Sequence, residues 1–193
     1  MSKPLILTSP KGRAIFPHLT EPDTKFKPEG EYHVKLECNK ADCEKIVKKI
    51  KDCVALKVKE EHTKNPNVKI TYAPLPFEEK DEKIIFNFKM KASGTRRDNK
   101  KTFTQSPVLM DAELKPLGHD VQIWGDSILR ITFEPHSYSM PVGLGCTLRL
   151  KTVQVLELVT GKATNTLGEL KAEPMVAPVV KTESETPSNH NLY

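Results

Sequence analysis

The chain has 193 residues and a formal net charge of +5, which suits one domain with a tail or at most two small domains. No apolar run approaches the roughly 20 residues that cross a bilayer, and the N-terminus lacks the apolar run of a signal peptide. These features exclude a membrane-spanning protein and favour a cytoplasmic protein that folds around its own core without disulfides.

The first third of the chain predicts two strands and a turn between them. We expect residues 1–10 to form an N-terminal arm and residues 11–19 to form a strand that is interrupted or ended at Pro17. Charged residues beside prolines make residues 20–30 a turn segment. Tyr32 then begins an apolar–polar alternation, which predicts a second strand with Tyr32 in the core.

One helix is predicted, from about Lys40 to His62. Apolar residues recur there every three or four positions, and lysines occupy the opposite side. Asn39 suits the N-cap position, and Asp42 lies in the first turn, where the helix dipole favours an anion.

The cysteines predict small apolar core residues. Cys38, Cys43 and Cys53 faintly resemble a zinc cluster, but they lack CxxC spacing and no histidine lies at a matching distance. Cys43 and Cys53 also share the apolar side of the predicted helix, and Cys146 is remote in sequence. We therefore expect no metal site and no cofactor.

Residues 84–110 predict a basic β-hairpin. Residues 84–92 alternate apolar and polar side chains, and we expect them to pair with residues 102–110 through a polar turn. Seven basic residues and one acidic residue lie between Lys83 and Lys101. The irregular connection before them, 65–82, ends in an acidic run, so the positive charge is local. Such a patch favours a polyanion as ligand; the alternative is a solvated hairpin tip.

The C-terminal half predicts further strands. A short strand covers 121–124, another covers 129–134, and a loop rich in proline and glycine covers 135–145. The last strand, 144–159, shifts its apolar parity at residues 151–152, which indicates a bulge or bend of the kind that wraps a strand around a barrel.

Five to six strands, one helix and a bent closing strand predict a mainly β protein with an OB-fold barrel, and a β-sandwich is the alternative. The helix follows the second strand, whereas the commonest OB arrangement places it after the third, so we expect a variant with an inserted helix. This domain should cover residues 11–160. Residues 161–193 are rich in Pro, Ser, Thr and Asn, which predicts a disordered tail.

A basic sheet face with nearby rings is typical of proteins that hold single-stranded nucleic acid. The candidate phosphate contacts are Lys35, Lys89, Lys91, Arg96, Arg97, Lys100 and Lys101. The candidate stacking rings are Phe103, Trp124 and Tyr138. Trp124 follows Ile123 and could equally close the edge of the core, and Phe103 could cap the hairpin.

Three blocks resemble the single-stranded-DNA-binding protein of short-tailed, T-seven-like bacteriophages. The first is GEYHVKL at 30–36 with the helix that follows, and the second is FNFKMKAS at 86–93. The third is PHSYSMPVG at 135–143, which runs into LRL and VQVLEL within 148–158. Their order and spacing around one helix make the resemblance more specific than any single block.

The resemblance implies an OB-fold protein of the host cytoplasm that binds single-stranded DNA without sequence preference in phage replication and recombination, and that promotes annealing. It places Lys3 and Lys89 at basic DNA contacts, Lys91 where the family has an aromatic residue, and His136 and Tyr138 at two aromatic positions. It also implies contacts with the replication polymerase and primase-helicase, and a homodimer, through an acidic tail with a terminal aromatic residue. Here residues 161–193 carry four Glu and three Lys and end in Tyr193. The tail therefore has little negative charge with which to recruit these partners.

Other function classes have less support. The chain lacks a Walker loop, GxSxG, HExxH and a clustered pair of acids for catalytic metals, so we expect no enzyme. A protein-interaction module that grips an acidic partner, and an RNA-binding protein, remain the alternatives.

Overall fold

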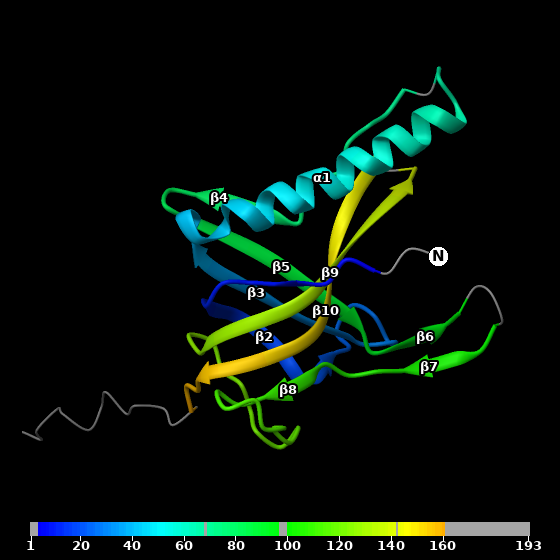
Figure 1. Ribbon diagram of the computed structural model, residues 1–193. Coiled ribbons are helices and arrows are strands. Elements are labelled where there is room, and N and C mark those ends of the chain that lie inside the picture. The colour runs from blue at the N-terminus through cyan, green and yellow to red at the C-terminus, as the bar shows by residue number, and fades with distance from the viewer. Residues whose placement is uncertain (1–3, 68, 97–99, 142, 161–193) are drawn as a thin grey trace, which may run out of the picture. The chain divides into compact units, whose positions relative to one another are not determined.

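The computed structural model describes residues 4–67, 69–96, 100–141 and 143–160. Five strands close into a barrel (Figure 1). They are β9 (Ile128–Met140), β2 (Gly12–Asp23), β3 (Glu31–Asn39), β5 (Lys83–Lys91) and β10 (Gly143–Glu157), paired in that order, with β10 paired back to β9. The β5–β10 pair is parallel, and the other four pairs are antiparallel. The predicted OB-fold with an early helix is confirmed, and the sandwich alternative is wrong.

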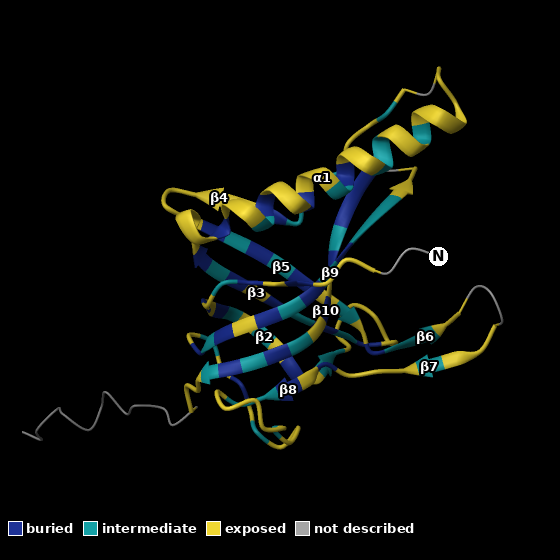
Figure 2. Ribbon diagram, in the orientation of Figure 1, coloured by how far each residue is buried: buried dark blue, intermediate teal, exposed yellow. Residues whose placement is uncertain are grey.

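Alternation along the strands builds the barrel core. Phe86 and Phe88 of β5 and Phe133 of β9 are fully buried, and the rings of Phe88 and Phe133 are 5.0 Å apart between centroids. The residues between them point outward, as a side-chain period of two requires. Figure 2 shows this change between buried and exposed positions along each barrel strand. Tyr32 is buried, as predicted.

Helix α1 (Lys40–Lys64) lies between β3 and β5 in the chain, and it contacts both of them as well as β9 and β10. Its buried stripe consists of Cys43, Val47, Ile50 and Val54, at the spacing that predicted it. Asn39 occupies the N-cap position, but its side chain does not cap the helix. Its Oδ1 instead accepts a hydrogen bond from Lys83 Nζ at 2.9 Å, so the predicted N-cap position is confirmed without a side-chain capping bond.

Two irregular positions shape the barrel strands. The register of β10 against β9 shifts between Leu150 and Thr152, at the predicted bulge. In β2 the register against β3 shifts after Ile15, where Phe16 has a φ of +48°. Pro17 therefore lies within a bulge and does not end the strand, which continues to Asp23.

The predicted hairpin of 84–92 with 102–110 is wrong. β5 pairs with β3, β10 and the short β4 (Phe77–Lys80), which lies inside the connection expected to be irregular. Within residues 84–110, the segment after β5 instead forms a short hairpin of β6 (Ser93–Thr95) and β7 (Thr102–Thr104), a two-stranded arm that projects from the barrel (Figure 1). β8 (Val108–Met110) runs parallel to β10. An apolar alternation identifies a strand's buried face but not its neighbour, which depends on contacts distant in sequence.

Three other segments differ in structure from the sequence-based prediction. Residues 121–124 form no strand, although Ile123 is buried. The expected loop at 135–145 is mostly a continuous β9–β10 hairpin, because residues 136–140 pair with 143–147. In the predicted arm, β1 (Leu7–Thr8) pairs with β9.

No helix among the described residues is both long enough and apolar enough to cross a membrane.

Candidate nucleic-acid interface

A basic groove of about 460 Å³ lies on the outer face of the barrel, between β5, β10 and the β6–β7 arm. Its lining contains five cations and one acid, Glu31. The cations are Lys89, Lys91, Arg96, Arg149 and Lys151. Lys89 faces outward because it follows the buried Phe88, and the parallel register places it beside Arg149. Two strands distant in sequence thus bring their cations together.

Ion pairs within the basic groove leave its charge uneven. Glu134 of β9, whose side chain is 16% exposed, pairs with Arg149 at 3.8 Å and Lys151 at 3.1 Å. Lys91 lies 3.9 Å from Glu29, at the limit of an ion pair. Within the described part of the chain, Lys89 and Arg96 have no such partner, so their charges are the ones most open to a bound anion.

Phe103 lies in the basic groove as a half-buried ring from β7. It packs across Gly94 of β6, where an added Cβ would lie 3.1 Å from the ring. Phe103 therefore rests on the arm with one side toward the groove. Arg96 directly follows β6 and is exposed. Lys100 and Lys101, just before β7 in the same arm, are exposed as well.

An aromatic groove of about 320 Å³ adjoins the basic groove, because Glu31 and Lys89 line both. Its rings are Phe16, 77% exposed, and Phe26, 82% exposed. Lys35 and Lys27 line it as well. Lys35 was predicted; Phe16 and Phe26 were missed, since neither belongs to a periodic pattern. A signal was present in the run KFKP at 25–28, where a large apolar residue lies between cations.

A tryptophan groove of about 380 Å³ continues from the aromatic groove, because Phe16 lines both. Trp124 is 48% exposed and lines this third groove, while its neighbour Ile123 is buried in the core. Trp124 thus lies half exposed beside a core residue, which is compatible with both a stacking ring and a residue at the core edge. The three grooves therefore lie next to one another in series, with Arg96 lining the first and Trp124 the last.

His136 and Tyr138 lie on β9 and line none of these three grooves. His136 is paired with Thr147, which does line the basic groove, so both predicted residues share the outer face of the β9–β10 ribbon. Burial, followed by repulsion from Arg149, lowers the pKa of His136, which is neutral at pH 7. Tyr138 packs over Gly145, where an added Cβ would lie 2.7 Å from the phenol oxygen.

Three predicted residues lie outside the described residues: Lys3, Arg97 and Tyr193. The remaining predicted cations and rings are placed as above. Arg149 and Lys151 were missed, because their position beside Lys89 depends on the parallel pairing of β10 with β5.

The cysteines do not gather into the suggested cluster. Cys38 lies beside Cys43, and Cys53 lies beside Cys146. Cys38, Cys43 and Cys146 are buried. Burial raises the pKa of the Cys146 thiol to about 12, which keeps it protonated and a poor metal ligand.

Comparison with known proteins gives a consistent result. The family model described as single-stranded DNA-binding protein, bacteriophage T7, matches residues 13–158. The crystal structure of gp2.5, a single-stranded DNA-binding protein encoded by bacteriophage T7, has a TM-score of 0.70 and 29% identity, and covers 82% of this chain and 95% of that chain. No curated protein matches the chain significantly by sequence.

More distant structures share the fold. The single-stranded DNA-binding protein of bacteriophage Enc34 has a TM-score of 0.57 and 16% identity, and covers 85% of this chain and 88% of that one. The Enc34 protein in complex with single-stranded DNA has a TM-score of 0.56 and 15% identity, and covers 80% and 88%. At this identity the likeness concerns the fold alone.

Proposed function

The chain belongs to the family of the single-stranded DNA-binding protein of bacteriophage T7, and we propose that it binds single-stranded DNA without sequence preference along the three connected grooves. The observation that carries this proposal is that the basic, aromatic and tryptophan grooves adjoin in series and share lining residues. A single strand needs cations for its phosphates and flat rings for its bases, and the track offers both along its length.

The distribution of chemistry along the track suggests how a strand lies in it. Lys89, Arg96 and Arg149 would hold phosphates in the basic groove, where Phe103 offers one ring. Phe16 and Phe26 would stack bases in the aromatic groove. Each stacked base contributes roughly 1–3 kcal/mol by truncation, and this contribution does not depend on the base's identity.

The exposed rings also favour single-stranded over duplex DNA. Bases in a duplex are stacked on one another, and their faces are not open to a side chain. A protein that only bound an acidic partner would have little use for Phe16 and Phe26, which are both largely exposed aromatic residues. These rings therefore favour nucleic acid over the protein-interaction alternative. RNA offers the same phosphates and base faces, and it is a second candidate ligand.

We extend the proposal to phage DNA replication and recombination, in which the protein would cover and anneal single strands and would act without catalysis. Lys3, Arg97, Lys100 and Lys101 would add phosphate contacts, and His136 and Tyr138 a further surface on the β9–β10 ribbon. Tyr193 would contact the replication polymerase or primase-helicase. Loss of polymerase capture by the full chain after Tyr193→Ala would support this role, and unchanged capture would remove it.

Fluorescence anisotropy with labelled oligomers tests the central proposal. Oligo-dT and a mixed-sequence single strand should bind with similar affinity and much more tightly than a duplex of the same length. Binding should weaken linearly in log salt, with a slope of about −0.7 for each phosphate contact. Equal affinity for duplex and single strand would refute the proposal, and tighter binding to an RNA oligomer would transfer it to RNA.

A further inference from the structure

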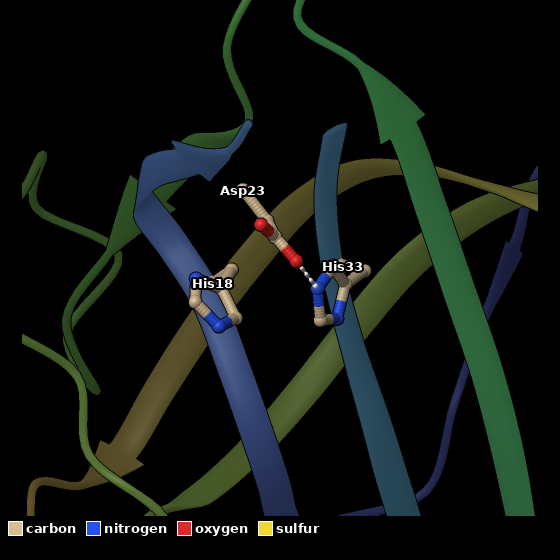
Figure 3. A group of neighbouring side chains, drawn as sticks. All are labelled: His18, Asp23 and His33. Atoms are coloured by element: carbon tan, nitrogen blue, oxygen red, sulfur yellow. Dashed lines mark hydrogen bonds and ion pairs between the residues drawn. The ribbon is translucent and has the colours of Figure 1, made fainter. Parts of the chain in front are cut away.

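Two histidines and one aspartate gather on the outer face of the barrel where β2 meets β3 (Figure 3). His18 and Asp23 come from β2, and His33 comes from β3. Their potential ligand atoms all lie within 4.8 Å of one another. In the part of the chain that the structure describes, this is the one group of three His, Cys, Asp or Glu side chains with such spacing.

The irregular course of β2 creates this group. His18 is directly paired with His33, and their ring centroids are 4.7 Å apart with a tilt of 41°. The register then shifts, so that Asp23, five residues further along β2, is paired with Glu31, only two residues from His33. A regular strand would have carried residue 23 far beyond the two rings. The bulged segment instead brings its carboxylate back toward them.

The Asp23 carboxylate is already oriented for a ligand. Its Oδ1 accepts a hydrogen bond from the Lys25 backbone N–H at 2.9 Å, and its Oδ2 lies 3.3 Å from His33 Nε2. The Lys25 hydrogen bond and then the His33 contact lower the pKa of Asp23. No side-chain hydrogen bond from His18 to a described residue competes for its ring nitrogens.

We propose that His18, Asp23 and His33 bind a divalent transition-metal ion of the Zn²⁺ class. Two imidazole nitrogens and one carboxylate oxygen are a recurrent protein ligand set for Zn²⁺, and with three protein ligands one tetrahedral position stays open. The hydrogen bond from the Lys25 amide would serve as an outer-shell contact that holds the carboxylate in place. Cys38, Cys43 and Cys146 are buried, so they lie apart from this surface group.

The ion would lie beside the aromatic groove, which Asp23 and His33 help to line. Lys89 is paired with His33 across β3 and β5, and Glu31 nearby is engaged by Lys27 at 2.8 Å. A bound dication would therefore raise the positive potential of a surface that is already cationic. The open coordination position could then accept a phosphate oxygen, a consequence that rests on the proposed single-strand binding.

Cobalt titration of the full chain, without nucleic acid, tests the site itself. One Co²⁺ per chain should bind, with d–d absorption but no thiolate charge-transfer band, and Zn²⁺ should displace it. The variants His18→Gln, His33→Gln and Asp23→Asn should each weaken Co²⁺ binding at least ~10-fold, the lower bound for loss of even an outer-shell partner. His62→Gln, an exposed histidine near the end of α1, should bind Co²⁺ as the wild type does.

His18 is exposed, so its variant should fold even if another does not. Absence of Co²⁺ binding in the wild type, a thiolate band, or wild-type affinity in His18→Gln would overturn the proposal. Oligo-dT affinity with Zn²⁺ and with a chelator then tests the consequence. Zinc should tighten binding several-fold in the wild type and not in Asp23→Asn. If oligo-dT binding persists in the chelator, the proposed single-strand binding does not depend on the metal site. If bound zinc leaves the oligo-dT affinity unchanged, the proposed contact between zinc and a phosphate is refuted.

Discussion

Lys89→Ala should weaken binding to every single-stranded sequence without changing the stability of the fold. Lys89 lines both the basic and the aromatic groove, is exposed, and has no ion-pair partner among the residues that the structure describes. Its removal deletes one cation from the centre of the track and leaves no buried group unpaired. Surface changes of this kind alter unfolding free energies by less than about 0.5 kcal/mol.

The size of the effect follows from elementary electrostatics. A unit charge pair 4 Å apart contributes about 1 kcal/mol in water, which corresponds to a roughly five-fold loss of affinity. One phosphate contact fewer should also reduce the slope of log affinity against log salt by about 0.7. Both quantities come from one anisotropy titration of oligo-dT repeated over a salt series.

A matched control is Lys48→Ala, which removes an exposed lysine from α1 outside the three grooves. It should leave both affinity and salt slope close to wild type. An unchanged slope in Lys89→Ala, or an equal loss in Lys48→Ala, would show that the basic groove is not the phosphate track.

Phe26→Ala should weaken oligo-dT binding by roughly 1–3 kcal/mol with little change in Tm, because the residue is 82% exposed and its ring contact is an exposed one, with the Lys25 ammonium 5.5 Å from the ring centroid. Wild-type affinity in the same titration would remove this ring from the interface. Gly145→Ala should lower the Tm in a circular-dichroism melt, since the new Cβ would lie 2.7 Å from the Tyr138 phenol oxygen, and an unchanged Tm would show that the ring moves freely. The pKa of His136 is lowered from 6.5 by burial, so the unfolded chain binds its proton more readily than the folded one, and stability should fall as pH drops below about 6.5. His136→Gln should reduce that loss in unfolding titrations between pH 7 and 5, and an identical pH profile would contradict the assignment.

Features that depend on neighbouring residues were predictable from the sequence. The helix from Lys40 follows from apolar spacing, and the bulge near Thr152 follows from a change of parity within one strand. Both signals are local, so no knowledge of the rest of the fold was needed. The alternation in 84–92 likewise identified Lys89 as an outward cation.

Features that depend on pairing at a distance were not predictable in the same way. Arg149 joins the interface only because β10 runs parallel to β5 in a particular register. Tyr138 was expected in a loop, because nearby prolines and glycines outweigh the weak alternation of 135–145, yet strand pairing with residues 143–147 orders this segment. Phe16 and Phe26 carried no periodic signal, and it is their high exposure in the folded chain that identifies them as open rings.

The backbone conformation at Phe16 is strained, and this strain lowers the stability of the folded protein. A φ of +48° is unfavourable for a residue with a bulky side chain, by roughly 1–2 kcal/mol, and glycine would adopt it without strain. Replacement by glycine would therefore favour folding while it removed the ring shared by two grooves. Selection for thermal stability alone would therefore favour glycine at position 16, whereas the proposed stacking of bases on Phe16 would favour keeping the ring.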